Sequence, residues 1–159
     1  MLRAIIFSIV VALTDLAQFQ PARAAEPEIY YFGANGCDFC ANGLTFLKRL
    51  QNDDARIRLH DYDISGNPDD AIIYVRVVTA IGLSNPQVPL TIIGHHVIIG
   101  YEDDESTGNE IRLTVEQCRV KSCPDILHGL VTIGSDVAAM EPSASWTVHR
   151  RFAKSAQGQ

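Results

Sequence analysis

The chain has no excess of basic residues, no long apolar run and no internal repeat, and each absence excludes a class of protein. Its 159 residues carry a formal net charge of −6, so no basic face stands out to neutralise phosphates, and we expect no nucleic-acid partner. The apolar stretch from Ala4 to Leu13 is shorter than the roughly 20 residues that a membrane-spanning helix needs. What remains is the length and composition of one globular domain.

The first 24 residues have the pattern of a secretory signal peptide. Arg3 provides a short positive segment, the apolar stretch follows it, and Ala22 and Ala24 form a small-residue cleavage site. We therefore expect removal of residues 1–24 and a periplasmic or secreted mature protein. An uncleaved N-terminal membrane anchor is the alternative, and the absence of cysteine near the cleavage point argues against a lipoprotein.

Cysteine is scarce too, and the four residues of this type all lie in the part that we expect to be exported. Disulfides form and persist in exported proteins. Four cysteines allow three ways of forming two disulfides, and the short separations favour Cys37–Cys40 and Cys118–Cys123.

Four strand-like runs occur along the chain. They are rich in β-branched and aromatic residues and cover residues 28–34, 56–64, 88–94 and 95–101. We expect the last two to be joined by a tight turn at Gly94-His95-His96, in which the two histidines are solvated rather than metal ligands.

Two helix signals lie between these strands. After the first cysteine pair, Cys40, Leu44 and Leu47 recur at the spacing of one helical face. Asn67 and Pro68 are residue types that favour the N-cap and the first position of a helix.

A third helix signal follows the last strand-like run. Thr107 and Glu110 have the spacing of a capping box, and the acidic residues 102–106 before them are expected to form a solvated loop. Ile111, Val115 and Cys118 would form the buried face of this helix.

The order β-α-β-α-β-β-α is that of an α/β fold. The first two strands are expected to be parallel through a helical crossover, and the last two to form an antiparallel hairpin. We place this domain at residues 25–124 and assign no structure to the tail, residues 125–159.

The Cys37-x-x-Cys40 pair falls where the first strand gives way to the first helix. At a helix N-terminus the unpaired N–H groups and the dipole favour a thiolate at Cys37, and the thiolate is the attacking form in disulfide exchange. Cys40, one turn later, would be shielded and able to resolve a mixed disulfide. Asp38 opposes the thiolate, which favours a reductant over a strong oxidant, and Phe39 is a candidate contact for a protein partner.

Three motifs in this order resemble the thioredoxin superfamily, and in particular its glutaredoxin-like members. They are "CDFC" after the strand "IYYFGANG", "VPLTII", and "VIIGYEDD". The resemblance covers about Glu28 to Cys123 and implies a thioredoxin-like fold with a four-stranded mixed sheet flanked by helices. It also implies a protein thiol–disulfide oxidoreductase in which Cys37 and Cys40 are catalytic and the Val88-Pro89 loop, with a cis proline, holds the partner chain.

The implied partners are other exported proteins with thiols or disulfides and a membrane-bound or small-thiol redox donor. We expect a monomer that needs no organic cofactor. Glutathione remains an alternative partner, with Asp103 or Asp104 as a candidate contact, although a single glycine, Gly100, stands where glutathione-using glutaredoxins usually carry two.

Other interpretations of the cysteines stay open at this point. Cys37 and Cys40 could form a static disulfide or half of a metal site, in which case the protein would be an exported copper- or zinc-binding module. A redox-inert adaptor that keeps only the fold is a further alternative. For Cys118 and Cys123 we expect a structural disulfide, with a second, relaying redox pair as the alternative.

Overall fold

The first strand-like run becomes an inner strand of a five-stranded mixed sheet. The computed structural model describes residues 26–131 and 146–151. Their strands pair in the order β2-β1-β3-β4-β5. β2 is parallel to β1, β5 is parallel to β4, and the pairs formed by β1, β3 and β4 are antiparallel. The strands are β1 (Glu28–Gly33), β2 (Arg58–Asp63), β3 (Leu90–Ile93), β4 (His96–Ile99) and β5 (Thr147–Arg150).

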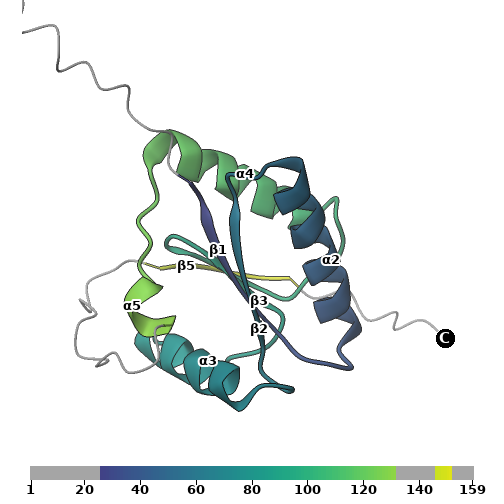
Figure 1. Ribbon diagram of the computed structural model, residues 1–159, viewed down its shortest axis with the longest axis vertical. Helices are drawn as coiled ribbons and strands as arrows, with labels where there is room; N and C mark the ends of the chain where they lie inside the picture. The colour runs from purple at the N-terminus through teal and green to yellow at the C-terminus, as the bar shows by residue number, and fades with distance from the viewer. Residues whose placement is uncertain (1–25, 132–145, 152–159) are drawn as a thin grey trace, which may run out of the picture.

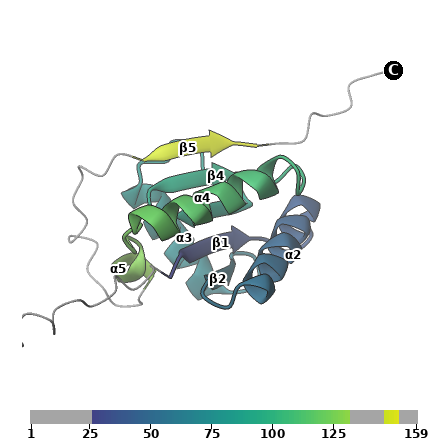
Figure 2. The same ribbon diagram turned by 90° about the horizontal axis from the view of Figure 1, so that it is seen from above.

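The helices cover both faces of this sheet, as Figures 1 and 2 show, with α2 and α4 on one face and α3 and α5 on the other. Ile29 and Tyr31 point toward α2 and α4, whereas Tyr30 and Phe32 point toward α3 and α5. Because β1 is buried on both faces from Ile29 onward, residues 29–32 are all apolar or aromatic rather than alternating with polar residues. The helices are α2 (Asp38–Asp53), α3 (Pro68–Ala80), α4 (Thr107–Lys121) and α5 (His128–Val131).

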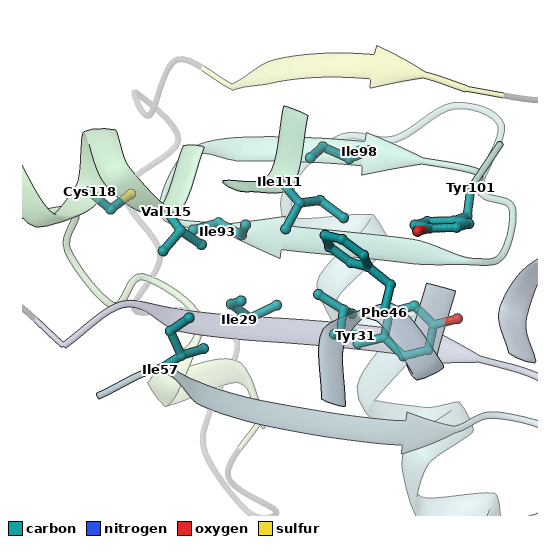
Figure 3. Packing of buried hydrophobic residues seen from close by; sticks show 11 residues of the cluster. Ile29, Tyr31, Phe46, Ile57, Ile93, Ile98, Tyr101, Ile111, Val115 and Cys118 are labelled. Carbon is teal, nitrogen blue, oxygen red and sulfur yellow. The ribbon is translucent and has the colours of Figure 1, made fainter. Parts of the chain in front are cut away.

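The core between the sheet and helices α2 and α4 runs the length of the domain. Figure 3 shows Tyr31 and Tyr101 toward one end of this core and Cys118 at the other. Phe46 lies between the two tyrosines and α4, and its ring is 5.8 Å from that of Tyr101.

The expected face of α4 is confirmed. On α2, Cys40 and Leu47 are buried as expected and Leu44 is partly buried, whereas Gly43 and Phe46 are buried in addition to the expected residues.

The start of α3 is the one that the sequence predicts. The side chain of Asn67 accepts a hydrogen bond from the backbone N–H of Asp69 at 3.0 Å, and Pro68 occupies the first helical position. This cap decides for a helix in a segment whose β-branched residues also suit a strand.

The predicted capping box at the start of α4 is wrong. The N-cap is Ser106, which makes no side-chain capping bond, and the carboxylate of Asp103 accepts from the Ser106 N–H at 2.7 Å instead. The side chain of Glu110 turns to β5, where its carboxylate contacts Arg151 Nε at 2.9 Å and His149 Nδ1 at 3.1 Å. His149 of β5 and Arg151, just after that strand, thus bind the carboxylate that the capping box requires.

The expectation of four strands is corrected to five. β5, within the tail to which the sequence assigned no structure, adds to the free edge of β4. Thr147 N–H donates to His95 O at 3.0 Å, and Arg151 N–H donates to Ile99 O at 2.5 Å. The β3–β4 turn is also shorter than expected, since only Gly94 and His95 lie between the strands and His96 begins β4.

This topology confirms the thioredoxin-like α/β fold: a parallel β1-α2-β2 unit, a crossover through α3, an antiparallel β3–β4 hairpin and a closing helix α4. Within the two described ranges, no helix is long and apolar enough to cross a membrane. The expected signal peptide and its alternative, a membrane anchor, lie outside the described residues.

Candidate active site

Cys37 is the N-cap of α2, at the junction with the loop that follows β1. Its Sγ lies 3.1 Å from the backbone N of Cys40, which donates to it, and its carbonyl accepts from Ala41 N–H at 3.0 Å. The two cysteines form a disulfide with a Cα–Cα distance of 5.2 Å. Cys37 is partly exposed, whereas Cys40 is 3% exposed. The expected contrast between an accessible and a shielded sulfur is therefore present.

Beneath the disulfide, Tyr31 supports the first turn of α2 from the sheet. Its buried hydroxyl donates to the carbonyl of Cys40 at 2.7 Å. Burial, followed by the charge of Asp61, raises the pKa of Tyr31 well above its usual value, so the hydroxyl keeps its proton and remains a donor. Gly33 makes this contact possible, because a Cβ there would lie 2.9 Å from the Tyr31 ring.

The loop before Cys37 is fixed to the loop that follows β2. Asn35 Nδ2 donates to Asp63 Oδ2 at 2.6 Å, and the Asn35 backbone N–H donates to Ser65 Oγ at 2.7 Å. Asp63 also accepts from the hydroxyl and N–H of Ser65 and from the N–H of Gly66. These hydrogen bonds, with those of Ser65 the strongest, lower the pKa of Asp63. Asp63 is therefore an ionised anchor for the cysteine loop.

A pocket of about 350 Å³ opens beside the disulfide, on the side of β2. Cys37 and Cys40, the two residues of this disulfide, line the pocket. Its volume is in the range of small-ligand sites. The other lining residues are Tyr31, Gly33, Ala34, Asn35, Gly36, Ala41, Leu44, Asp61, Tyr62 and Asp63.

The Val88-Pro89 peptide bond is cis, as the resemblance implies. Pro89 is buried, and its carbonyl accepts from Gly100 N–H at 2.7 Å. Because Leu90 pairs with Phe32, the proline lies at the end of the sheet where β1 leads to the cysteines. Val88 and Pro89 do not line the pocket beside the disulfide, and Phe39 does not line it either; its side chain is 44% exposed on the first turn of α2.

The second cysteine pair lies at the opposite end of the sheet. Cys118, in the last turn of α4, forms a disulfide with Cys123 just after the helix, with a Cα–Cα distance of 4.7 Å. Cys118 is 1% exposed and belongs to the core under α4. Gly94, in the β3–β4 turn, packs on this bond so closely that a Cβ there would lie 2.8 Å from Cys123 Cβ.

The acidic segment after β4 is more structured than the expected solvated loop. Asp104 accepts from Tyr101 OH and from Arg49, each at 2.5 Å, and the pKa of Asp104 is lowered, chiefly by the tyrosine. Asp103 accepts from Glu105 and Ser106. Both candidate glutathione contacts are thus engaged within the chain. Among the described residues, no group of three or more His, Cys, Asp or Glu is placed to hold a metal ion.

Sequence reasoning missed the residues that hold and shape this site, namely Tyr31, Asn35, Asp61 and Asp63. Tyr31 looked like an ordinary strand residue, because nothing in the pattern announces its buried hydroxyl. One local signal was available: Asp63, Ser65 and Gly66 are residue types of an Asx turn, whose carboxylate bonds the backbone two residues on.

The fold and the cysteine pair together define a thioredoxin-like domain with a Cys-x-x-Cys disulfide at a helix N-terminus. No protein-family model and no curated protein matches the sequence. Among solved structures, the glutaredoxin grx-1 from Archaeoglobus fulgidus is similar, with 23% sequence identity and a TM-score of 0.40. The alignment covers 54% of this chain and 87% of that one.

Proposed function

We propose that this protein is an exported thiol–disulfide oxidoreductase that acts on protein partners through Cys37 and Cys40. The observation that carries the proposal is the asymmetry of the pair: a partly exposed sulfur at the N-cap of α2 is linked to a sulfur that is 3% exposed. Disulfide exchange needs this division between an attacking and a resolving thiol.

The backbone around the pair suits each step of the exchange. In the reduced protein, the Cys40 N–H that now donates to Cys37 Sγ would stabilise a Cys37 thiolate, together with the positive end of the α2 dipole. The thiolate attacks one sulfur of a partner disulfide and expels the other as a thiolate. Cys40 then attacks Cys37 Sγ and releases the second partner sulfur, which restores the Cys37–Cys40 disulfide.

The neighbouring residues support contacts with a protein chain. The cis Val88-Pro89 bond lies at the same end of the sheet as the pair, and the exposed ring of Phe39 adds an apolar contact beside it. We propose exported proteins as partners and a membrane-bound or small-thiol donor that resets the pair, with no organic cofactor. Asp38, exposed next to Cys37, disfavours a strongly acidic thiol and so favours the reducing direction.

Trapping of the mixed disulfide tests this function directly. In a Cys40→Ala variant the resolving thiol is missing, so reduced protein incubated with insulin should accumulate a Cys37–insulin adduct, seen by intact mass under acid quench. The matched control is Cys37→Ala, in which the shielded Cys40 should form the adduct about a hundredfold more slowly. Equal slow rates for both variants would reject the exchange mechanism.

A further inference from the structure

The pocket beside the disulfide contains carboxylates and no basic residue. Asp61 and Asp63 line it, and its lining includes no lysine, arginine or histidine. Asp63 accepts hydrogen bonds from neutral donors, Asn35, Ser65 and Gly66, and within the described part of the chain no basic group lies at ion-pair distance from it. The negative charge of Asp63 is therefore held in place without being neutralised.

Asp61 adds a second charge that is only weakly compensated. Among the described residues its cationic partner is Lys48, whose Nζ lies 3.5 Å from Asp61 Oδ2, and the side chains of Lys48 and Asp61 are 58% and 36% exposed. Exposed pairs of this kind exchange readily with water and with other ions. Lys48 does not line the pocket, so a group inside it faces the carboxylates.

We propose that this pocket is a specificity subsite that selects disulfides flanked by a positively charged group. The inference rests on the proposed exchange at Cys37. A substrate sulfur bonded to Cys37 stands at the pocket wall, so groups two or three bonds from that sulfur reach the space between the cysteine loop and β2. A cation there is attracted by Asp61 and Asp63, and a carboxylate is repelled.

The reaction balances without any further cofactor. The reduced protein supplies two thiols, and the disulfide R–S–S–R accepts two electrons. The first S–S bond breaks as Cys37 bonds to one sulfur, and the second R–S⁻ leaves when Cys40 forms the Cys37–Cys40 bond. The two thiol protons pass through solvent to the two leaving thiolates.

The test compares three disulfides with a similar skeleton and different charge: cystamine, bis(2-hydroxyethyl) disulfide and 3,3′-dithiodipropionate. Single-turnover oxidation of the pre-reduced protein is followed at equal pH. Each rate constant is divided by that of dithiothreitol with the same disulfide, which removes the intrinsic reactivity of the disulfide. We expect the cationic disulfide to exceed the anionic one by about tenfold at about 20 mM salt and by less than about threefold at about 500 mM.

Charge variants assign this preference to the pocket. Asp61→Asn should lower the ratio of cationic to anionic rates to about threefold, and Asp61→Lys should reverse the order. Asp53→Asn removes the same charge from the exposed far end of α2 and should leave the ratio unchanged. Circular dichroism checks that each variant is folded, and the salt dependence of the parent chain provides a test that needs no variant.

The outcomes separate this inference from the proposed function. If the parent chain reduces the neutral disulfide but shows no order by charge, or if Asp53→Asn changes the ratio as much as Asp61→Asn does, the subsite is wrong and the exchange function stands. If the parent chain reduces none of the three disulfides, both fail.

Discussion

The two disulfides of this protein occupy opposite ends of one sheet and meet opposite surroundings. Cys37–Cys40 begins a helix, leaves one sulfur partly exposed and lines a pocket of about 350 Å³. Cys118–Cys123 joins the last turn of a helix to the segment after it, beside a crevice of about 10 Å³; Cys118 is 1% exposed and Cys123 is partly exposed. Each pair joins a buried cysteine to a partly exposed one, so the two ends differ in the space beside the disulfide and in its position on the helix rather than in the exposure of the sulfurs.

The helix dipole reinforces this contrast. At the start of α2, free N–H groups favour a thiolate at Cys37, whereas carbonyl groups at the end of α4 disfavour one at Cys118. Arg119 and Lys121 offset that effect in part, but the Arg119 guanidinium is already paired with Asp54 and Glu116. Position on a helix, rather than the presence of a disulfide, marks the pair suited to exchange.

Removing each disulfide in turn is the strongest test of the contrast between the two pairs, because we expect one removal to affect mainly the exchange rate and the other mainly the stability. Cys37→Ser should slow oxidation by a neutral disulfide by about a hundredfold, because only the shielded Cys40 thiol is left to attack. The double variant Cys118→Ser, Cys123→Ser should keep the exchange rate within about threefold of the parent's. Its free energy of unfolding should fall by about 2 kcal/mol, because a short loop is no longer closed in the unfolded chain.

Stopped-flow oxidation of the reduced protein measures the rates, and urea unfolding measures the stability. Loss of exchange in the double variant, with its fold intact by circular dichroism, would instead favour a relay through the second pair.

Within the candidate active site, the sequence predicts the cysteine loop better than it predicts the residues that β2 contributes. A strand followed by Cys-x-x-Cys and a helical apolar spacing is a local pattern, so the N-cap position of Cys37 could be read directly. The positions of Asp61 and Asp63 in the pocket could not be predicted in this way, because these residues reach it only through the parallel register that places Gly33 opposite Asp63. That register depends on the packing of α2 over the sheet, which no local pattern encodes.

β5 shows the same limit in the fold. Thr147, His149 and Arg150 are polar and carry no strand-like run of their own. The strand forms because β4 offers an unpaired edge and Glu110 of α4 binds His149 of β5 and Arg151, which follows it. Stabilisation by distant partners explains both the extra strand and the failed capping box.

Two glycines, one beside each disulfide, allow the packing at the two ends of the sheet to be compared. Both have positive φ, +77° at Gly36 and +54° at Gly94, but only Gly94 is crowded, with Cys123 Cβ 2.8 Å from the position of an added Cβ. Gly36→Ala should cost about 1 kcal/mol of stability, from the backbone alone. Gly94→Ala should cost about 3 kcal/mol, because overpacking adds to that strain. Equal losses in urea unfolding would show that the distal end is not tightly packed.

Two neighbouring tyrosines of β1 each donate a hydrogen bond near one end of the sheet, so replacing them tests the two ends separately. Tyr30, on the α3 face, donates to Asp125 Oδ1 at 2.7 Å, and the same oxygen accepts from His128 N–H at 3.1 Å at the start of α5. Tyr30→Phe leaves a partly buried carboxylate without its tyrosine donor. We expect a loss of about 2 kcal/mol in the free energy of unfolding and faster hydrogen exchange in α5, with the first turn of α2 unchanged.

Tyr31→Phe is the matched change at the other end, and its effect should be smaller. The hydroxyl that it removes donates to a neutral acceptor, the carbonyl of Cys40, at 2.7 Å. A hydrogen bond between neutral groups contributes about 1 kcal/mol, so stability should fall by about that amount and amides in the first turn of α2 should exchange about fivefold faster. Hydrogen exchange with mass detection resolves the two regions. If Tyr31→Phe loosened α5, the two ends of the sheet would not be independent, and the proposed separation between an exchanging and a structural disulfide would lose its basis.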